Sequence, residues 1–80
     1  MQAYVLIQTD LGRVTDILRK VKEIAAVERA DSVTGPYDII ALLDAPSVEE
    51  IGREVVESIQ VIDGVTRTLT CPIGNLDQLH

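Results

Sequence analysis

The spacing of apolar residues changes along this chain, and each change predicts a new element. Gln2 to Thr9, QAYVLIQT, is a short apolar run that stops at polar and glycine residues, so it predicts a strand. After it, apolar residues recur every three or four positions, which indicates a helix with one buried face. Asp10 is placed to cap this helix at its N-terminus. The apolar positions of the helix are Leu11, Val14, Ile17, Leu18, Val21 and Ile24.

Two strands are expected in the middle of the chain. Ala26 to Val33 carries Glu28, Arg29 and Asp31, and a strand with these charges suits the exposed edge of a sheet. Ile39 to Leu43, IIALL, is short and begins with β-branched residues, which predicts a buried strand.

A second helix and a last strand are expected after them. Ser47 stands three residues before Glu50, and this spacing is a capping box that marks a helix start. The apolar positions of this helix are Val48, Ile51, Val55 and Ile59. Asp63 and Gly64 end the segment. Val65 to Cys71 then alternates threonines with other residues, which predicts a strand with one hydroxyl-lined face.

This order, βαββαβ, is that of the ferredoxin-like split unit. It predicts an α+β domain with a four-stranded antiparallel sheet, the first and third strands at its centre and both helices on one face. Ala3 to Ile7 and Ile39 to Leu43 are nevertheless apolar on both faces of the sheet. We therefore expect another copy to cover the second face, sheet against sheet, in a two-fold dimeric α+β barrel.

Composition narrows the class of protein. The 80 residues make one domain, and 46% hydrophobic with 25% charged residues is typical of a globular protein. The formal net charge of −6 repels phosphate backbones, so direct nucleic-acid binding is not expected. No apolar run approaches the roughly 20 residues of a membrane helix, and the N-terminus lacks signal-peptide features, so the default compartment is the cytoplasm.

Side chains for catalysis or metal binding are scarce. The one histidine, His80, is the last residue, where chains usually fray, and the one cysteine, Cys71, has no CxxC companion. No cluster of His, Cys and carboxylates has metal-ligand spacing, so neither a metal nor another cofactor is expected. The stretch from Asp10 to Val21 has a single glycine before the helix, and we interpret it as an ordinary helix start. The glutamates from Glu49 to Glu57 are interpreted as the solvent-exposed face of a helix.

The connection TGPYD, Thr34 to Asp38, concentrates residues with special backbone and side-chain properties. Gly35 permits an unusual dihedral angle or a close approach, and Pro36 suits the second position of a tight turn. Tyr37 adds a ring with a polar tip, and Asp38 can accept hydrogen bonds from local N–H groups or from an ammonium group. A hairpin turn that only joins two strands explains the same residues, so both interpretations stay open.

The stretch VTGPYDIIALL, Val33 to Leu43, resembles the Val-Thr-Gly-x-Tyr/Phe-Asp turn and following strand of the effector-binding (RAM) domain of Lrp/AsnC transcription regulators. The opening AYVLIQT strand, the helix capped at Ser47 and the final VTRTLTCPI strand agree with that domain. The resemblance implies one RAM domain over residues 1–80, dimers formed through the sheet, and rings of dimers with small effectors, usually amino acids, between them. It implies regulation of transcription or metabolism, not catalysis.

The resemblance also assigns a ligand turn, whose residues are Thr34, Gly35, Tyr37 and Asp38, with Pro36 at the variable position. Backbone N–H groups of this turn would hold an α-carboxylate, Asp38 an α-ammonium group, and Tyr37 would form part of the wall. Thr66 and Thr68 are the strand hydroxyls expected to complete the pocket. Strand propensity alone explains the threonine row about as well.

Lrp/AsnC regulators of the usual kind carry an N-terminal helix-turn-helix domain, whereas this sequence starts at the first strand of the effector domain. We therefore expect no DNA-binding domain, and an effect on transcription would pass through co-assembly with full-length regulators. The expected partners are other copies of the chain, a small effector and such regulators.

Two other classes of protein share this order of elements. A small dimeric α+β barrel enzyme would use Tyr37, Asp38 or His80 as acid or base, in a cleft between sheet and helices. An ACT-like regulatory domain would also bind an amino acid but would pair its sheets side by side. The doubly apolar central strands favour the face-to-face arrangement of the RAM domain.

Overall fold

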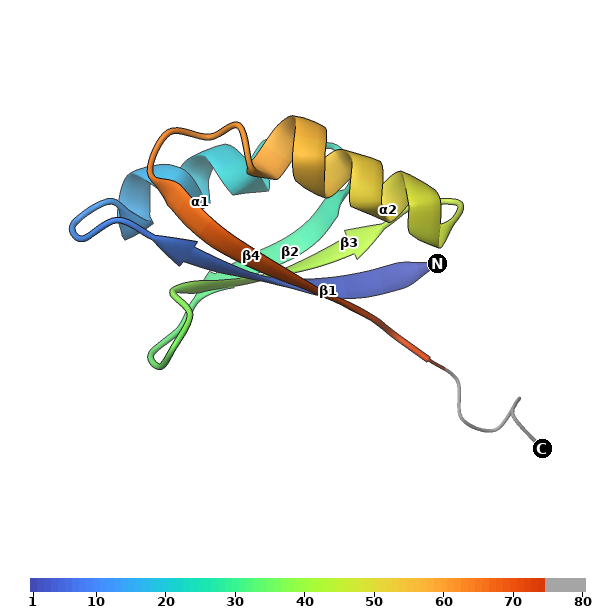
Figure 1. Ribbon diagram of the computed structural model, residues 1–80, viewed down its shortest axis with the longest axis horizontal. Helices are drawn as coiled ribbons and strands as arrows, with labels where there is room; N and C mark the ends of the chain where they lie inside the picture. The colour runs from blue at the N-terminus through green and yellow to red at the C-terminus, as the bar shows by residue number, and fades with distance from the viewer. Residues whose placement is uncertain (75–80) are drawn as a thin grey trace.

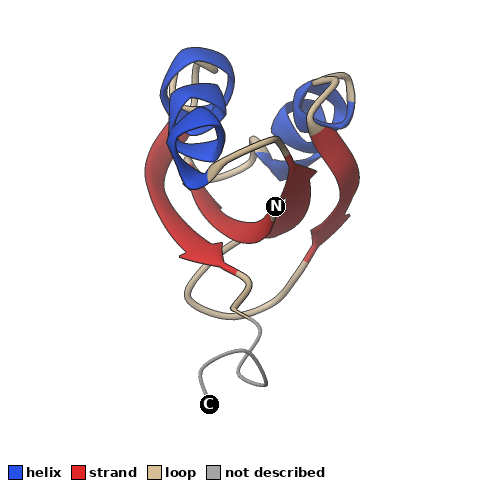
Figure 2. Cartoon of the chain, turned by 90° about the vertical axis from the view of Figure 1, so that its right-hand side faces the viewer, coloured by secondary structure: helices blue, strands red, loops and turns tan. Residues whose placement is uncertain are grey.

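The computed structural model describes residues 1–74, and its elements follow the predicted order of strands and helices. Figure 1 shows them: β1 (Gln2–Thr9), α1 (Val14–Lys22), β2 (Val27–Ser32), β3 (Ile39–Asp44), α2 (Val48–Glu54), η1 (Val55–Ile59) and β4 (Val65–Pro72). The strands form one antiparallel sheet in the order β2-β3-β1-β4, so β1 and β3 are central as predicted. Both helices cover the same face of this sheet (Figure 2). The chain is therefore an α+β domain of the ferredoxin-like type.

The core lies between the sheet and the helices. Alternate residues of the two central strands point toward the helices and are fully buried: Ala3, Val5, Ile7, Ile39, Ala41 and Leu43. Most of them form one cluster with Ile17, Val21, Val55 and Ile59 of the helical segments, and Ile51 of the second helical segment is also fully buried. Burial of these aliphatic side chains, at about 25 cal/mol for each Å² removed from water, is the main term that holds the helices on the sheet.

The first helix begins later than its apolar spacing predicts. Its N-cap is Arg13, which makes no side-chain capping bond, so the prediction that Asp10 caps the helix is wrong. The Asp10 N–H instead donates to the Gly64 carbonyl at 2.8 Å. Leu11, which the spacing assigns to the buried stripe, is fully exposed. The reason is Gly12, whose φ of +80° turns the chain before the helix can start.

The predicted start of the second helix is confirmed. The Ser47 side chain accepts a hydrogen bond from the Glu50 N–H at 3.2 Å. Val48 at the first helical position is 46% exposed, while the later apolar positions, Ile51, Val55 and Ile59, are buried. The helix then continues into the π-helical turn η1, where the Gln60 N–H donates to the Val55 carbonyl at 2.8 Å.

The other face of the sheet carries no helix within residues 1–74, and we call it the open face. Its central side chains, which alternate with the buried ones, are Tyr4, Leu6, Arg29, Asp31, Ile40, Leu42, Leu69 and Cys71. Tyr4 and Leu69 are each 47% exposed. The doubly apolar character of the central strands therefore leaves a largely apolar surface in contact with water.

Candidate functional site

The connection between β2 and β3 is held by backbone bonds and by the side chain of Asp38. The Val33 N–H donates to the Asp38 carbonyl at 2.9 Å, and the Asp38 N–H donates to the Ile7 carbonyl at 2.9 Å. Asp38 Oδ2 also accepts the Thr9 N–H at 2.8 Å and the Thr9 hydroxyl at 3.3 Å. These bonds tie the connection to the end of β1, so long-range contacts set its geometry together with its own turn residues.

The tip of this connection is exposed. Gly35 has a φ of +141°, which residues with a side chain rarely adopt. A Cβ at this position would meet nothing within 4 Å, so glycine is required for its dihedral angle and not for a close approach. The Pro36 carbonyl accepts a hydrogen bond from Gln8 Nε2 at 3.2 Å. Thr34 is exposed and Tyr37 is half-buried.

A hollow of about 550 Å³ lies between the β2–β3 connection and the β1–α1 connection, which sit at the same end of the sheet (Figure 1). We call it the loop hollow. Four of the residues predicted to bind a ligand line it: Gly35, Pro36, Asp38 and Thr66. Thr34, Tyr37 and Thr68 are not among the described residues that line it. Four of the seven predicted residues thus share one hollow, and their binding of a ligand stays a prediction.

The β1–α1 connection contributes residues that the sequence analysis does not assign to a site. Gln8, Thr9, Asp10, Leu11, Gly12 and Val14 line the loop hollow. The one signal for them in the sequence is the glycine turn before α1, which is also what an ordinary helix start looks like. Their approach to the β2–β3 connection depends on the Asp38 bonds to Thr9, which join residues 29 positions apart.

Of the predicted threonine row, Thr66 lines the loop hollow and Thr68 does not. The Thr66 hydroxyl lies 3.2 Å from the Gln8 carbonyl oxygen and 3.3 Å from Gln8 Oε1. Thr66 and Thr68 both line a smaller hollow of about 240 Å³ beside η1, where the Thr68 hydroxyl accepts a bond from Gln60 Nε2 at 2.9 Å. A register shift in the β1–β4 pairing, between Gln8 and Thr9, leaves Thr66 without a paired residue on β1.

An ion-pair cluster around Arg13 braces the β1–α1 connection. Arg13 Nη1 lies 3.2 Å from Asp63 Oδ2, and Nη2 donates to the Asp63 carbonyl at 3.1 Å and to Asp16 Oδ2 at 3.3 Å. The bond from Arg13, assisted by the charge of Lys20, lowers the pKa of Asp16 below its ordinary value. The bonds to Asp63 and Asp16 raise the pKa of Arg13. Because these groups are exposed, the cluster mainly positions the connection and adds little stability.

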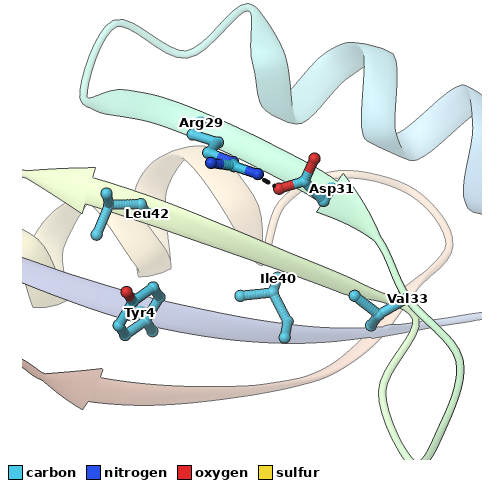
Figure 3. A pocket seen from close by; sticks show the side chains of 6 residues that line it. All are labelled: Tyr4, Arg29, Asp31, Val33, Ile40 and Leu42. Carbon is cyan, nitrogen blue, oxygen red and sulfur yellow. Dashed lines mark hydrogen bonds and ion pairs between the residues drawn. The ribbon is translucent and has the colours of Figure 1, made fainter.

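A second hollow, of about 270 Å³, lies on the open face. Figure 3 shows the six side chains that line it: Tyr4, Arg29, Asp31, Val33, Ile40 and Leu42. Arg29 Nε lies 2.8 Å from Asp31 Oδ2, and this bond raises the pKa of Arg29. The enzyme hypothesis places its cleft between sheet and helices, whereas this hollow lies on the other face, and neither Tyr37 nor Asp38, two of its three candidate acids or bases, lines it.

Other candidate chemistry is limited in the described part of the chain. Among residues 1–74, no three His, Cys, Asp or Glu side chains are grouped so that they could hold a metal ion. Cys71 is exposed on β4. His80 lies outside the described residues. None of the helices within residues 1–74 is long and apolar enough to cross a membrane.

Comparison with known proteins identifies the family. The family profile described as Lrp/AsnC ligand binding domain matches residues 2–73. The chain belongs to this family. TTHA0845 from Thermus thermophilus, known from its crystal structure, is similar at 36% identity and a TM-score of 0.88, over 92% of each chain. No match was found among curated proteins.

Two longer relatives of this Lrp/AsnC domain share its fold. E. coli AsnC matches with a TM-score of 0.84 at 22% identity, over 92% of this chain and 51% of AsnC. The transcriptional regulator NMB0573 from Neisseria meningitidis, solved in complex with L-Met, matches with a TM-score of 0.81 at 13% identity, over 92% of this chain and 49% of that regulator. The predicted RAM family and ferredoxin-like fold are confirmed, and the family indicates an effector-binding regulatory module.

Proposed function

We propose that this Lrp/AsnC domain binds an amino-acid effector in the loop hollow and acts on transcription or metabolism through changes in its assembly. The observation that carries the proposal is the grouping of the β2–β3 connection with Thr66 around one hollow of about 550 Å³, in a chain of a ligand-binding family. That volume suits a small metabolite.

The lining is complementary to both ends of an α-amino acid. Asp38 uses Oδ2 for both bonds to Thr9, and its Oδ1 has no hydrogen-bond partner among the described residues, so Oδ1 is available to an α-ammonium group. Backbone N–H groups around Gly35 suit an α-carboxylate. Leu11 is fully exposed at the same hollow and supplies apolar surface to cover the side chain of an effector.

We propose that a second copy covers the open face, which leaves the loop hollow at the end of the sheet accessible to neighbouring dimers. An effector that bridges two dimers has a higher affinity for the larger assembly and increases its population. Co-assembly with full-length Lrp/AsnC regulators in the cytoplasm would carry this change to DNA. The apolar side chains on both central strands support the dimer, because such a surface is costly to leave in water.

The test is calorimetry against each of the twenty amino acids, followed by light scattering coupled to size exclusion with those that bind. We expect one amino acid, or a few of similar chemistry, to bind and to change the mass of the assembly. Thr66→Val should lower the affinity about tenfold, because it removes a hydroxyl from the hollow while it keeps the shape of the side chain.

The matched control is Thr70→Val, on the same strand but paired with Val5 on the helix side of the sheet. Asp38→Ala is a poorer test, because it also breaks both bonds to Thr9. If no amino acid binds, or if the two threonine variants change the affinity equally, the loop hollow is not the effector site.

A further inference from the structure

The loop hollow is lined by two charged residues, and both are acidic. Asp38 stands on the β2–β3 connection and Asp10 on the β1–α1 connection, so they belong to the two opposite walls of the hollow. The other residues that line it are uncharged: Gln8, Thr9, Leu11, Gly12, Val14, Gly35, Pro36 and Thr66. Two negative charges with no positive charge in the lining favour a ligand that carries positive charge.

Asp10 combines a fixed backbone with an unpaired carboxylate. Its N–H donates to the Gly64 carbonyl at 2.8 Å, and its own carbonyl accepts the Arg13 N–H at 3.1 Å. No ion pair or side-chain hydrogen bond among residues 1–74 involves the Asp10 carboxylate. Because the backbone is already ordered, a ligand that binds this carboxylate has to order only one short side chain.

The positive charges near this connection are engaged elsewhere. Arg13 binds Asp63 at 3.2 Å and Asp16 at 3.3 Å. Arg67 lies opposite a lining residue of β1, but it lines the smaller hollow beside η1 and not the loop hollow. Asp16 and Asp63 thus have a positive partner within the chain, whereas Asp10 has none among residues 1–74. A cation from outside can therefore bind Asp10 without displacing an internal ion pair.

The hydrogen bonds within the lining point to the same class of ligand. Gln8 Nε2 donates to the Pro36 carbonyl, and the Thr9 N–H and hydroxyl both donate to Asp38 Oδ2. These side-chain donors are thus used inside the chain, while Asp38 Oδ1 and both carboxylate oxygens of Asp10 remain as acceptors. Ammonium and guanidinium groups donate hydrogen bonds and accept none, so they complement such a lining.

We propose that the effector of the loop hollow carries a second positive charge, as lysine and arginine do, and that Asp10 binds this second group. The inference rests on the proposed function and adds the chemical class of the effector. The α-ammonium group lies on Asp38, and the cation of the effector side chain lies on Asp10 at the opposite wall. The methylene groups between the two charges pack against Leu11, which is fully exposed at this hollow.

A structural role at the helix start does not explain Asp10. An aspartate shortly before a helix commonly caps it. Here the N-cap is Arg13, and the cap makes no side-chain hydrogen bond. The substitution Asp10→Asn therefore removes a charge from the hollow and leaves the backbone bonds of this position to Gly64 and Arg13 in place. It tests binding without a change in fold.

The experiment uses calorimetry with pairs of ligands that differ in one group. Norleucine is the uncharged counterpart of lysine, citrulline is that of arginine, and cadaverine is lysine without its α-carboxylate. We expect lysine or arginine to bind about tenfold more tightly than its uncharged counterpart, and cadaverine to bind more weakly than lysine. Asp10→Asn should weaken binding of the charged ligand about tenfold and leave binding of its uncharged counterpart unchanged, so that the preference disappears.

Glu57→Gln is the matched control. It makes the same change in net charge at an exposed position of η1 that lines none of the three hollows, so it should leave these affinities unchanged. If Asp10→Asn and Glu57→Gln have equal effects, Asp10 does not bind the effector and the inference is overturned. If an uncharged amino acid binds best and Thr66→Val weakens it, the loop hollow remains the effector site but the cationic class is wrong. If no amino acid binds, the proposed function and this inference are both overturned.

Discussion

Gly64 combines a backbone and a packing requirement in one residue. Its φ is +97°, and a Cβ on it would lie 2.9 Å from Ile17 Cδ1 and 3.2 Å from Arg13 Cζ. Its carbonyl also accepts the Asp10 N–H that fixes the β1–α1 connection. We expect Gly64→Ala to lower the free energy of unfolding by about 2 kcal/mol, because the strained dihedral and the clash act together. Urea unfolding followed by circular dichroism measures this change.

Gly52 is the matched control for that prediction. It lies in α2, is exposed, and a Cβ there would meet nothing within 4 Å. Gly52→Ala should therefore raise the free energy of unfolding by about 0.5–1 kcal/mol, since alanine is the better helix former. If both substitutions changed stability in the same direction, the stated role of Gly64 would be wrong.

The elements depend on end signals as much as on their apolar faces, and Ser47 is the clearest of these signals. Its side chain accepts the Glu50 N–H, one of the donors that a helix leaves unpaired at its start. We expect Ser47→Ala to lower the free energy of unfolding by about 1 kcal/mol, measured by thermal and urea unfolding. Ser58→Ala is the control: it removes a half-buried side-chain bond to Glu54 but leaves the helix start unchanged, and it should lower the free energy of unfolding by less than Ser47→Ala does. A larger loss for Ser58→Ala would contradict the capping argument.

The start of α2 is predictable from the sequence because the signal and its effect lie three residues apart. The start of α1 is not predictable in this way. The Asp10 N–H donates to the carbonyl of Gly64, which lies 54 residues further along the chain. The same reason limits prediction of the candidate site. The turn residues Gly35 and Asp38 stand out locally, whereas the register shift at Thr66 exists only in the pairing of β4 with β1. The strand order follows from the order of elements along the chain, and the unbroken apolar runs Ala3 to Ile7 and Ile39 to Leu43 agree with two central strands.

At the scale of the whole molecule, one sheet face is covered by helices and the other is not. Strands β1 and β3 are apolar on both faces, and within residues 1–74 only one of the two faces is buried. Ala3, Val5 and Ile7 are fully buried, while their neighbours Tyr4 and Leu6 keep contact with water. If a second copy supplies the missing cover, part of the stability of each protomer belongs to the dimer and depends on protein concentration.

Thermal unfolding at several concentrations tests that dependence. When dissociation accompanies unfolding, a tenfold dilution removes about 1.4 kcal/mol of stability from the dimer, and Tm should fall by about 4 °C for two chains of this length. Leu6→Asp should have a lower Tm that does not change with concentration, because a charged side chain in the middle of the open face prevents pairing. Calorimetric scans over a hundredfold range of concentration provide the measurement. A parent chain with a constant Tm over that range would mean that its protomer is stable without the second copy.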